Sequence, residues 1–269
     1  MSRRLRIVTL NTGKGDGHYR RRIELLIAGL KRLEPDIILL QEALATASGT
    51  LDTTADLAAG LGIPATFASA RTKCRMVEGE WLMCGSGLGA LSRLSVLETD
   101  RLSLPCDPAD GERVAQLLAF DWDGQLLLVV NLHLSHLHDR DDLRRDQMRT
   151  LFDHPWFERE WQTRLIAGDF NTIPSGLPAL FDVATGWHSR DSYVIAGGDE
   201  ARATVPVDAP PGEGFCVDYI ISIARQPGAH PDFRDTAIVL ADPTDGVYPS
   251  DHRGVMVDLL REEEAPGRL

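Results

Sequence analysis

The sequence predicts an α/β fold in which two β-sheets pack together and helices cover their outer faces. Three observations support this prediction. Short apolar strands alternate with amphipathic helices along the 269 residues. Several strands follow one another through tight turns, as they do in antiparallel hairpins. The composition, 43% hydrophobic and 25% charged, is that of a globular chain that can bury a large core.

The first part of the chain alternates predicted strands and helices. Arg6–Leu10 reads as an apolar strand, and Tyr19–Leu33 reads as an amphipathic helix with apolar residues at helical spacing. Pro35 ends that helix, because the residue before a proline disfavours the helical conformation. Asp36–Leu40 is then predicted to be a buried strand and Thr53–Leu61 a second helix.

Strands dominate the remainder of the chain. An Asp-Gly turn at 123–124 joins two of them, because this pair tolerates positive φ. Asp139–Phe152 is predicted to be helical, Val205–Gly214 a long surface loop and Arg261–Leu269 a frayed polar tail. Because strands that complete the sheets lie on both sides of that loop, we expect one domain over residues 1–269. The predicted strands are Gly87–Leu91, Ser95–Leu104, Val114–Asp121, Gln125–Leu132, Arg164–Ala167, Phe215–Ile221, Thr236–Leu240 and Val255–Leu259.

The charge of the chain limits the classes of partner. It has 28 Lys+Arg and 40 Asp+Glu, a formal net charge of −12. This disfavours a protein that coats DNA or an anionic membrane, which needs a broad positive field, but it allows an enzyme that engages one phosphate at a time. No long apolar run and no signal peptide are evident, so we expect no transmembrane segment. The four cysteines lack CxxC spacing, and we expect them to be free thiols in a reducing cytoplasm.

The Gly-rich segment 11–17 lies between a predicted strand and a predicted helix, where phosphate-binding loops occur. Its glycine spacing does not match GxGxxG, and Lys14 is followed by glycine rather than the Ser or Thr of a P-loop. We therefore predict a flexible turn between a strand and a helix.

Several polar residues follow predicted strands directly. Glu42 comes after the buried strand 36–41, and a carboxylate held at such a position suits a hard cation such as Mg²⁺. Asp169 and Asn171 follow another strand and point the same way if its geometry continues. A solvated strand end is the alternative for Glu42, and an Asx turn that only satisfies loop backbone is the alternative for the other two.

Two histidines also lie next to predicted strands. His252 is followed by the last strand, and it needs an acid other than its neighbour Asp251 to orient it, because adjacent side chains diverge. Asp218, which heads a strand, could hold the imidazole in one tautomer. His133 alone would more often be structural, and no regular Cys or His spacing supports zinc. Carboxylates gathered at one sheet edge would repel one another unless a cation lies among them.

Seven short motifs together resemble the endonuclease/exonuclease/phosphatase superfamily, which has the deoxyribonuclease-I-like fold. They occur in the superfamily's order between residues 9 and 252 and are TLN at 9–11, PDIILLQE at 35–42, GLGALSR at 87–93, NLHL at 131–134, GDFN at 168–171, VDYI at 217–220 and SDH at 250–252. The resemblance implies a four-layer sandwich, with two mixed β-sheets packed face to face and helices outside.

The resemblance also implies hydrolysis of a phosphoester that depends on Mg²⁺, with Mn²⁺ as a substitute. By this likeness Asn11, Glu42 and Asp251 bind or support the metal. Arg113, which lies just before the strand that leads to the His133 hairpin, would contact the phosphate of the substrate. A surface arginine is the alternative for Arg113.

The catalytic residues implied by the resemblance are His133, Asp169, Asn171, Asp218 and His252. Asp169 would orient or deprotonate the attacking water, although His252 could also act as the base. Asn171 would hold a phosphoryl oxygen, and His133 and His252, the latter oriented by Asp218, would flank the scissile phosphate.

The motifs are not specific for one substrate. We expect a phosphodiester, in a nuclease or a small-molecule phosphodiesterase. The alternatives are a phosphatase of lipid head groups or phosphomonoesters, and an inactive phosphate-binding module of the same fold. A nucleic-acid partner is compatible with the motifs, although the sequence has no extended basic surface.

Overall fold

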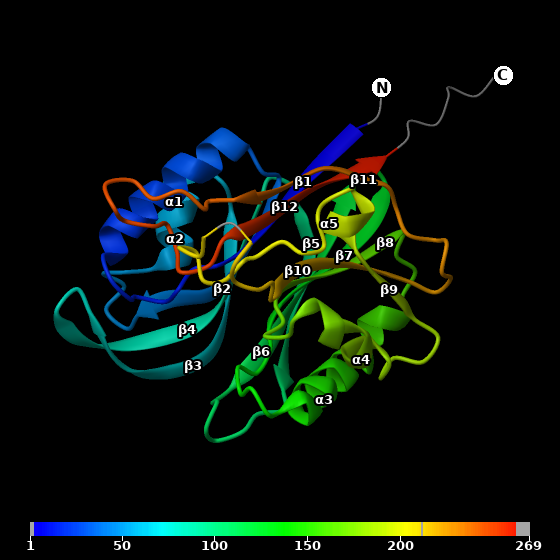
Figure 1. The fold of residues 1–269 in the computed structure, drawn as a ribbon, viewed down its shortest axis with the longest axis horizontal. Helices are drawn as coiled ribbons and strands as arrows, with labels where there is room; N and C mark the ends of the chain where they lie inside the picture. The colour runs from blue at the N-terminus through cyan, green and yellow to red at the C-terminus, as the bar shows by residue number, and fades with distance from the viewer. Residues whose placement is uncertain (1–2, 211, 262–269) are drawn as a thin grey trace.

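Two six-stranded sheets packed face to face form the centre of the protein (Figure 1). The structure is a computed structural model that describes residues 3–210 and 212–261. One sheet has the strand order β11-β12-β1-β2-β4-β3, and the other has the order β5-β6-β7-β8-β10-β9. Both sheets are mixed, because β1 and β2 are parallel, as are β7 and β8, within otherwise antiparallel sheets.

Most helices lie outside the two sheets, and the exception is Ser192–Ile195, whose Tyr193 packs in the layer between them. The elements in chain order are β1 (Arg3–Asn11), α1 (Tyr19–Leu33), β2 (Ile37–Thr46), α2 (Thr53–Leu61), β3 (Ala65–Val77), β4 (Glu80–Ser92), β5 (Val96–Leu104), β6 (Arg113–Trp122), β7 (Gln125–His133), α3 (Asp141–Phe152), β8 (Thr163–Asp169), α4 (Leu177–Phe181), β9 (His188–Asp191), α5 (Ser192–Ile195), β10 (Asp218–Ala224), β11 (Phe233–Val239) and β12 (Gly254–Arg261). Short 3₁₀ turns lie at Pro155–Glu158 and Pro174–Gly176.

Three apolar layers hold these elements together. The central layer joins the inner faces of the two sheets, where Ile7 and Leu39 pack with Val129 and Leu165. A second layer packs α1 and α2 onto the sheet that contains β1, and a third packs α3 and α4 onto the sheet that contains β7. Figure 1 shows these helix pairs on opposite sides of the molecule. The predicted four-layer sandwich is therefore confirmed.

Some element bounds differ from the prediction. β3 and β9 were not predicted, and the ladder of β10 starts at Asp218 rather than Phe215. Phe215 instead forms an isolated bridge to Val205 in the predicted loop. The predicted frayed tail lies, apart from Arg261 at the end of β12, outside the described residues. That residues 1–269 form one domain stays a prediction. Within the described part of the chain, no helix has the length and apolar character needed to cross a bilayer.

Gly168 lies where β7 and β8 come closest. Its φ is +140°, and a Cβ atom there would lie 2.0 Å from the carbonyl oxygen of Leu132, its partner in the ladder. We expect Gly168→Ala to lower the free energy of unfolding by about 3 kcal/mol or more, since strain and overlap add. Urea denaturation measures this change.

Gly124→Ala is the matched control for this prediction. Gly124 also has positive φ, +82°, but a Cβ atom there would meet no atom of residues 3–210 or 212–261 within 4 Å. Its loss should stay near 1 kcal/mol, the cost of the backbone conformation alone. Equal losses in the two variants would contradict the proposed overlap with Leu132.

Candidate active site

Three adjacent strands of one sheet bring His133, Asp169 and Asp218 together. β7 ends at His133, β8 ends at Asp169 and β10 begins at Asp218. Asp169 is the ladder partner of both His133 and Asp218. Because β7 and β8 are parallel and β10 is antiparallel to β8, all three residues lie at one edge of the sheet.

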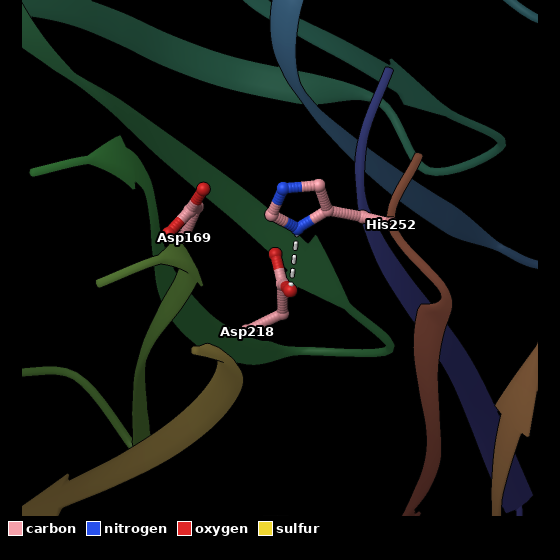
Figure 2. Close-up of side chains that lie close together, drawn as sticks. All are labelled: Asp169, Asp218 and His252. Carbon is pink, nitrogen blue, oxygen red and sulfur yellow. Dashed lines mark hydrogen bonds and ion pairs between the residues drawn. The ribbon is translucent and has the colours of Figure 1, made fainter. Parts of the chain in front are cut away.

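The other sheet contributes Asn11 and His252 to the same place. Asn11 is the last residue of β1, and its Nδ2 donates to Asp169 Oδ2 over 3.0 Å. His252 lies in the turn before β12, which pairs with β1. Figure 2 shows its ring beside Asp218, with 2.9 Å between His252 Nδ1 and Asp218 Oδ2, while the second ring nitrogen points away from Asp218. Ligand atoms of Asp169, Asp218 and His252 all lie within 4.8 Å of one another.

Burial gives these groups unusual protonation. Burial, and then the negative charge of Asp218, raise the pKa of Asp169 to about 7. Burial would lower the pKa of His252, but its ion pair with Asp218 outweighs burial and raises this pKa to about 10. Burial, and then the charge of Arg113, lower the pKa of His133 well below its usual value. At neutral pH the cluster therefore holds one cationic and one neutral imidazole.

Asp169 also belongs to a tight turn. Its Oδ1 accepts from the backbone N–H of Asn171 over 2.9 Å, which is the Asx turn weighed as the alternative to function. Its other oxygen, Oδ2, faces Asn11 Nδ2 at 3.0 Å and His133 Nε2 at 3.5 Å. The turn therefore holds the carboxyl group in place and leaves Oδ2 directed into the cluster. Asn171 itself has φ of +48°, and its Nδ2 donates to Leu134 O over 3.0 Å.

Glu42 occupies a different position from the predicted one. β2 continues to Thr46, so Glu42 does not follow the strand but lies within it. It has φ of +54°, at an irregularity where the ladder to β4 breaks between Leu40 and Ala43. This irregularity turns its side chain away from the regular alternation of the strand, and its carboxylate forms an ion pair with Lys14.

Asp251 lies beside Gly13 of the β1–α1 loop. Ser250 Oγ donates to Asp251 Oδ1 over 3.1 Å and to Asn11 O over 2.6 Å. A Cβ atom on Gly13 would lie 2.5 Å from Asp251 Oδ1, so only glycine leaves room for this carboxylate. The described residues grouped within 4.8 Å do not include Glu42 or Asp251.

Arg113 is buried rather than a surface arginine, and it begins β6. Its Nε donates to Asp110 Oδ2 over 3.0 Å, and its Nη2 lies 3.1 Å from His136 Nδ1. Asp110 fixes the guanidinium at the wall of a pocket beside the acid–histidine cluster. The lining of this pocket includes Lys14, Glu42, Arg71, Arg113 and His133.

The donor set fits a hard divalent cation. Among the described residues, Asp218 Oδ1 is buried without a hydrogen-bond partner, and burial and then the charge of Asp218 raise the pKa of Asp169. A cation nearby would relieve both. Glu42 is more open to an incoming ion than the two cluster carboxylates, because its side chain is 13% exposed against 2% for Asp169 and 0% for Asp218, and Asp251 is exposed as well.

Sequence reasoning missed several residues that support the site. Gln41 Nε2 donates to Asn131 Oδ1 over 2.7 Å and Asn131 Nδ2 donates to Gly89 O over 3.0 Å, which links the two sheets below the cluster. The guanidinium of Arg22, buried on α1, holds the β1–α1 loop. An arginine one turn before Leu26, on the apolar side of the predicted helix, was the available signal for Arg22.

The fold and the site define a four-layer α/β sandwich with acidic and histidine side chains gathered where its two sheets meet. A model of the Endonuclease/Exonuclease/phosphatase family matches residues 8–252. The chain belongs to this family, as the seven motifs predicted. A search of curated protein sequences finds no match to the chain.

Solved structures share this fold at low sequence identity. An endonuclease/exonuclease/phosphatase family protein from Leptotrichia buccalis is 17% identical, covers 95% of this chain and 99% of its own, and has a TM-score of 0.72. One from Beutenbergia cavernae is 21% identical, with coverage of 96% and 71% and a TM-score of 0.73. TDP2 of D. rerio, solved in complex with a single strand DNA product, is 18% identical, with coverage of 95% and 98% and a TM-score of 0.69.

Proposed function

We propose that the protein is a Mg²⁺-dependent hydrolase of phosphodiesters that uses an activated water as its nucleophile. The observation that carries this proposal is Asp169, a buried carboxyl group with a pKa of about 7 that faces Asn11 and His133 and lies beside the His252–Asp218 pair. A base with a pKa near the working pH is well suited to take a proton from water. Membership of a family named for nucleases and phosphatases supports the same reaction class.

Glu42 would hold the divalent cation, with Asn11 and Asp251 in support. When bound, Mg²⁺ or Mn²⁺ neutralises charge on the phosphoryl and leaving oxygens of the substrate. Asn11 stands between the metal site and the base, because its Nδ2 donates to Asp169. Its Oδ1 accepts from the backbone N–H of Gly13 over 3.0 Å, which fixes the orientation of the amide.

The remaining steps belong to the side chains of the cluster. Asp169 orients the water and takes its proton. His252 stays protonated beside Asp218, so its free ring nitrogen donates to a phosphoryl or leaving oxygen instead of acting as the base. His133, Asn171 and Arg113 add donors on the other side of the phosphate, where charge develops during attack.

A phosphodiester that engages the pocket locally fits this site better than a long duplex. Lys14, Arg71 and Arg113 line one pocket, which suits a single phosphate, while the net charge of −12 opposes an extended grip on nucleic acid. The D. rerio neighbour was solved with a single strand DNA product, so a single-stranded DNA end is the nucleic acid to assay first.

Hydrolysis of bis(p-nitrophenyl) phosphate, with and without Mg²⁺ or Mn²⁺, tests the proposal. We expect metal-dependent turnover that exceeds turnover of p-nitrophenyl phosphate, a monoester. Parallel assays of single-stranded DNA, RNA, phosphoinositides and sphingomyelin would then separate the substrate classes. A folded sample with no turnover under any divalent cation would support the inactive binding module instead.

Glu42→Gln is expected to raise the Mg²⁺ concentration for half-maximal activity about 10-fold or more, because a metal ligand loses its charge. Titrating activity with Mg²⁺ measures the change. Glu112→Gln is the matched control, since Glu112 lines the same pocket but is exposed and should leave the titration unchanged. Superimposable titrations of the Glu42 and Glu112 variants would argue against Glu42 as a ligand.

We also propose a cytoplasmic location. All four cysteines are free thiols, two buried (Cys84 and Cys216) and two exposed (Cys74 and Cys106). Free exposed thiols fit a reducing compartment. Fractionation of cells that express the tagged chain tests this location, and recovery of the chain outside the cytoplasmic fraction would contradict it.

A further inference from the structure

The β1–α1 loop holds Lys14 in one place. Lys14 has φ of +50°, a left-handed conformation that is unfavourable for a residue with a side chain. Arg22 offsets this cost, because its guanidinium donates to the carbonyl oxygens of Thr12, Gly13 and Lys14 over 2.8, 3.2 and 2.8 Å. The guanidinium of Arg22 therefore links the predicted turn to the first turn of α1. These hydrogen bonds thus hold Lys14 in a conformation that it would not adopt readily alone.

The side chain of Lys14 lies on the carboxylate of Glu42. Their side chains are 21% and 13% exposed, and Nζ of Lys14 contacts Oε1 of Glu42. Glu42 has positive φ as well, at +54°, so both partners adopt unfavourable backbone conformations in order to meet. Both residues line the pocket that His133 and Arg113 also line. A surface ion pair would not need two such residues at the wall of the candidate active site.

We infer that Lys14 is a built-in counter-ion. Its ammonium group pairs with the carboxylate of Glu42 before the divalent cation binds, and then pairs with a phosphate oxygen of the substrate. This inference rests on the proposed function, in which Glu42 holds the cation. An ammonium group and a divalent cation compete for the same carboxylate oxygens, so binding of the ion releases Lys14. The flexible stem of lysine allows its ammonium to move while the backbone stays fixed.

The surroundings of the released ammonium suit a phosphate. Arg71 and Arg113 line the same pocket, and Asp110 holds Arg113 through Nε and Nη2, the second of which also contacts His136. Lys14, Arg71 and Arg113 come from the β1–α1 loop, β3 and β6, and thus surround one space from three directions. Three cations around one space can donate to the oxygens of a single phosphodiester group.

Mn²⁺ binding without substrate, monitored by the electron paramagnetic resonance signal of the free ion, tests whether Lys14 competes with the cation for Glu42. We expect Lys14→Met to bind Mn²⁺ about fivefold more tightly than the wild type, because the competing charge is gone. Lys73→Met is the matched control. Arg75, burial and then Arg71 and Lys14 lower the pKa of Lys73, which places it in the same cationic group, but no ion pair to Glu42 is found for it in the described residues. We expect less than a twofold change there.

The KM for bis(p-nitrophenyl) phosphate at saturating Mn²⁺ tests the second half of the inference. We expect it to rise about fivefold in Lys14→Met, so that metal binding improves while substrate binding weakens. Lys14→Gln, with a similar stem and no charge, should repeat both changes if the first variant folds poorly. If Lys14→Met and Lys73→Met bind Mn²⁺ with equal affinity, the inference about Lys14 is overturned and the proposed function stands. If the wild type binds no Mn²⁺, both the inference and the proposed function are overturned.

Discussion

Replacing Asp169 with asparagine is expected to lower kcat for bis(p-nitrophenyl) phosphate by at least about 10²-fold, the contribution of a positioned general base. The amide keeps the size of the side chain but cannot take the proton. In the wild type, kcat should rise with pH as Asp169 loses its proton, since its pKa is raised to about 7 and only the ionised form accepts a proton from water. This rise should be absent in the variant.

The control for the Asp169 variant is Asp182→Asn, an exposed carboxylate after α4 that should leave kcat unchanged. Circular dichroism and the melting temperature would show that both variants fold. A kcat of Asp169→Asn within a few-fold of the wild type would exclude Asp169 as the base. If Asp169→Asn loses activity but its residual kcat still rises with pH as in the wild type, the rise belongs to another group.

His252→Ala is expected to lower kcat by at least about 10²-fold as well, because the phosphoryl group loses its charged donor. The variant also leaves Asp218 buried without its ion-pair partner, so part of the effect should appear as lower stability. Measuring kcat at a temperature well below the melting point of each variant separates the two effects.

An exposed histidine, His138, provides the comparison for His252. His138→Ala should keep both the rate and the melting temperature of the wild type. Asp218→Asn adds a second comparison, because it keeps the imidazole but removes the charge that holds its proton. A near-normal kcat in His252→Ala would sink the assignment of His252 to the phosphate.

α1 and α2 were predictable because their signals are local, whereas the short helices α4 and α5 were not predicted. α1 and α2 begin and end where the apolar spacing, Pro35 and Gly62 place them, and tertiary contacts do not change those bounds. β3 escaped prediction for the opposite reason. Its second half, from Arg71 to Arg75, is largely exposed and charged, and it is a strand because it pairs with β4. Strand formation there depends on cross-strand pairing with β4 and not on an apolar alternation within the segment itself.

The candidate site was predictable where it follows strand ends. Asn11, His133 and Asp169 end three strands, and motif order and the family resemblance together brought them to one edge. The position of Glu42 was not predictable, because a bulge within a long strand depends on pairing with β4. The pairing of Lys14 with Glu42 depends in turn on how Arg22 folds the loop, and neither leaves a periodic signal in the sequence.

The division of the site between the two sheets has a consequence for its precision. Asn11 and His252 come from one sheet and the turn before its strand β12, Asp169 and Asp218 come from the other sheet, and Gln41 and Asn131 form one of the polar links between the sheets. A slide of one sheet over the other by a fraction of a bond length would leave every strand and helix intact, yet it would separate the base from its partners. The accuracy of catalysis is thus set by resistance of the sandwich to shear, and apolar side chains remote from the phosphate become part of the machinery that aligns it.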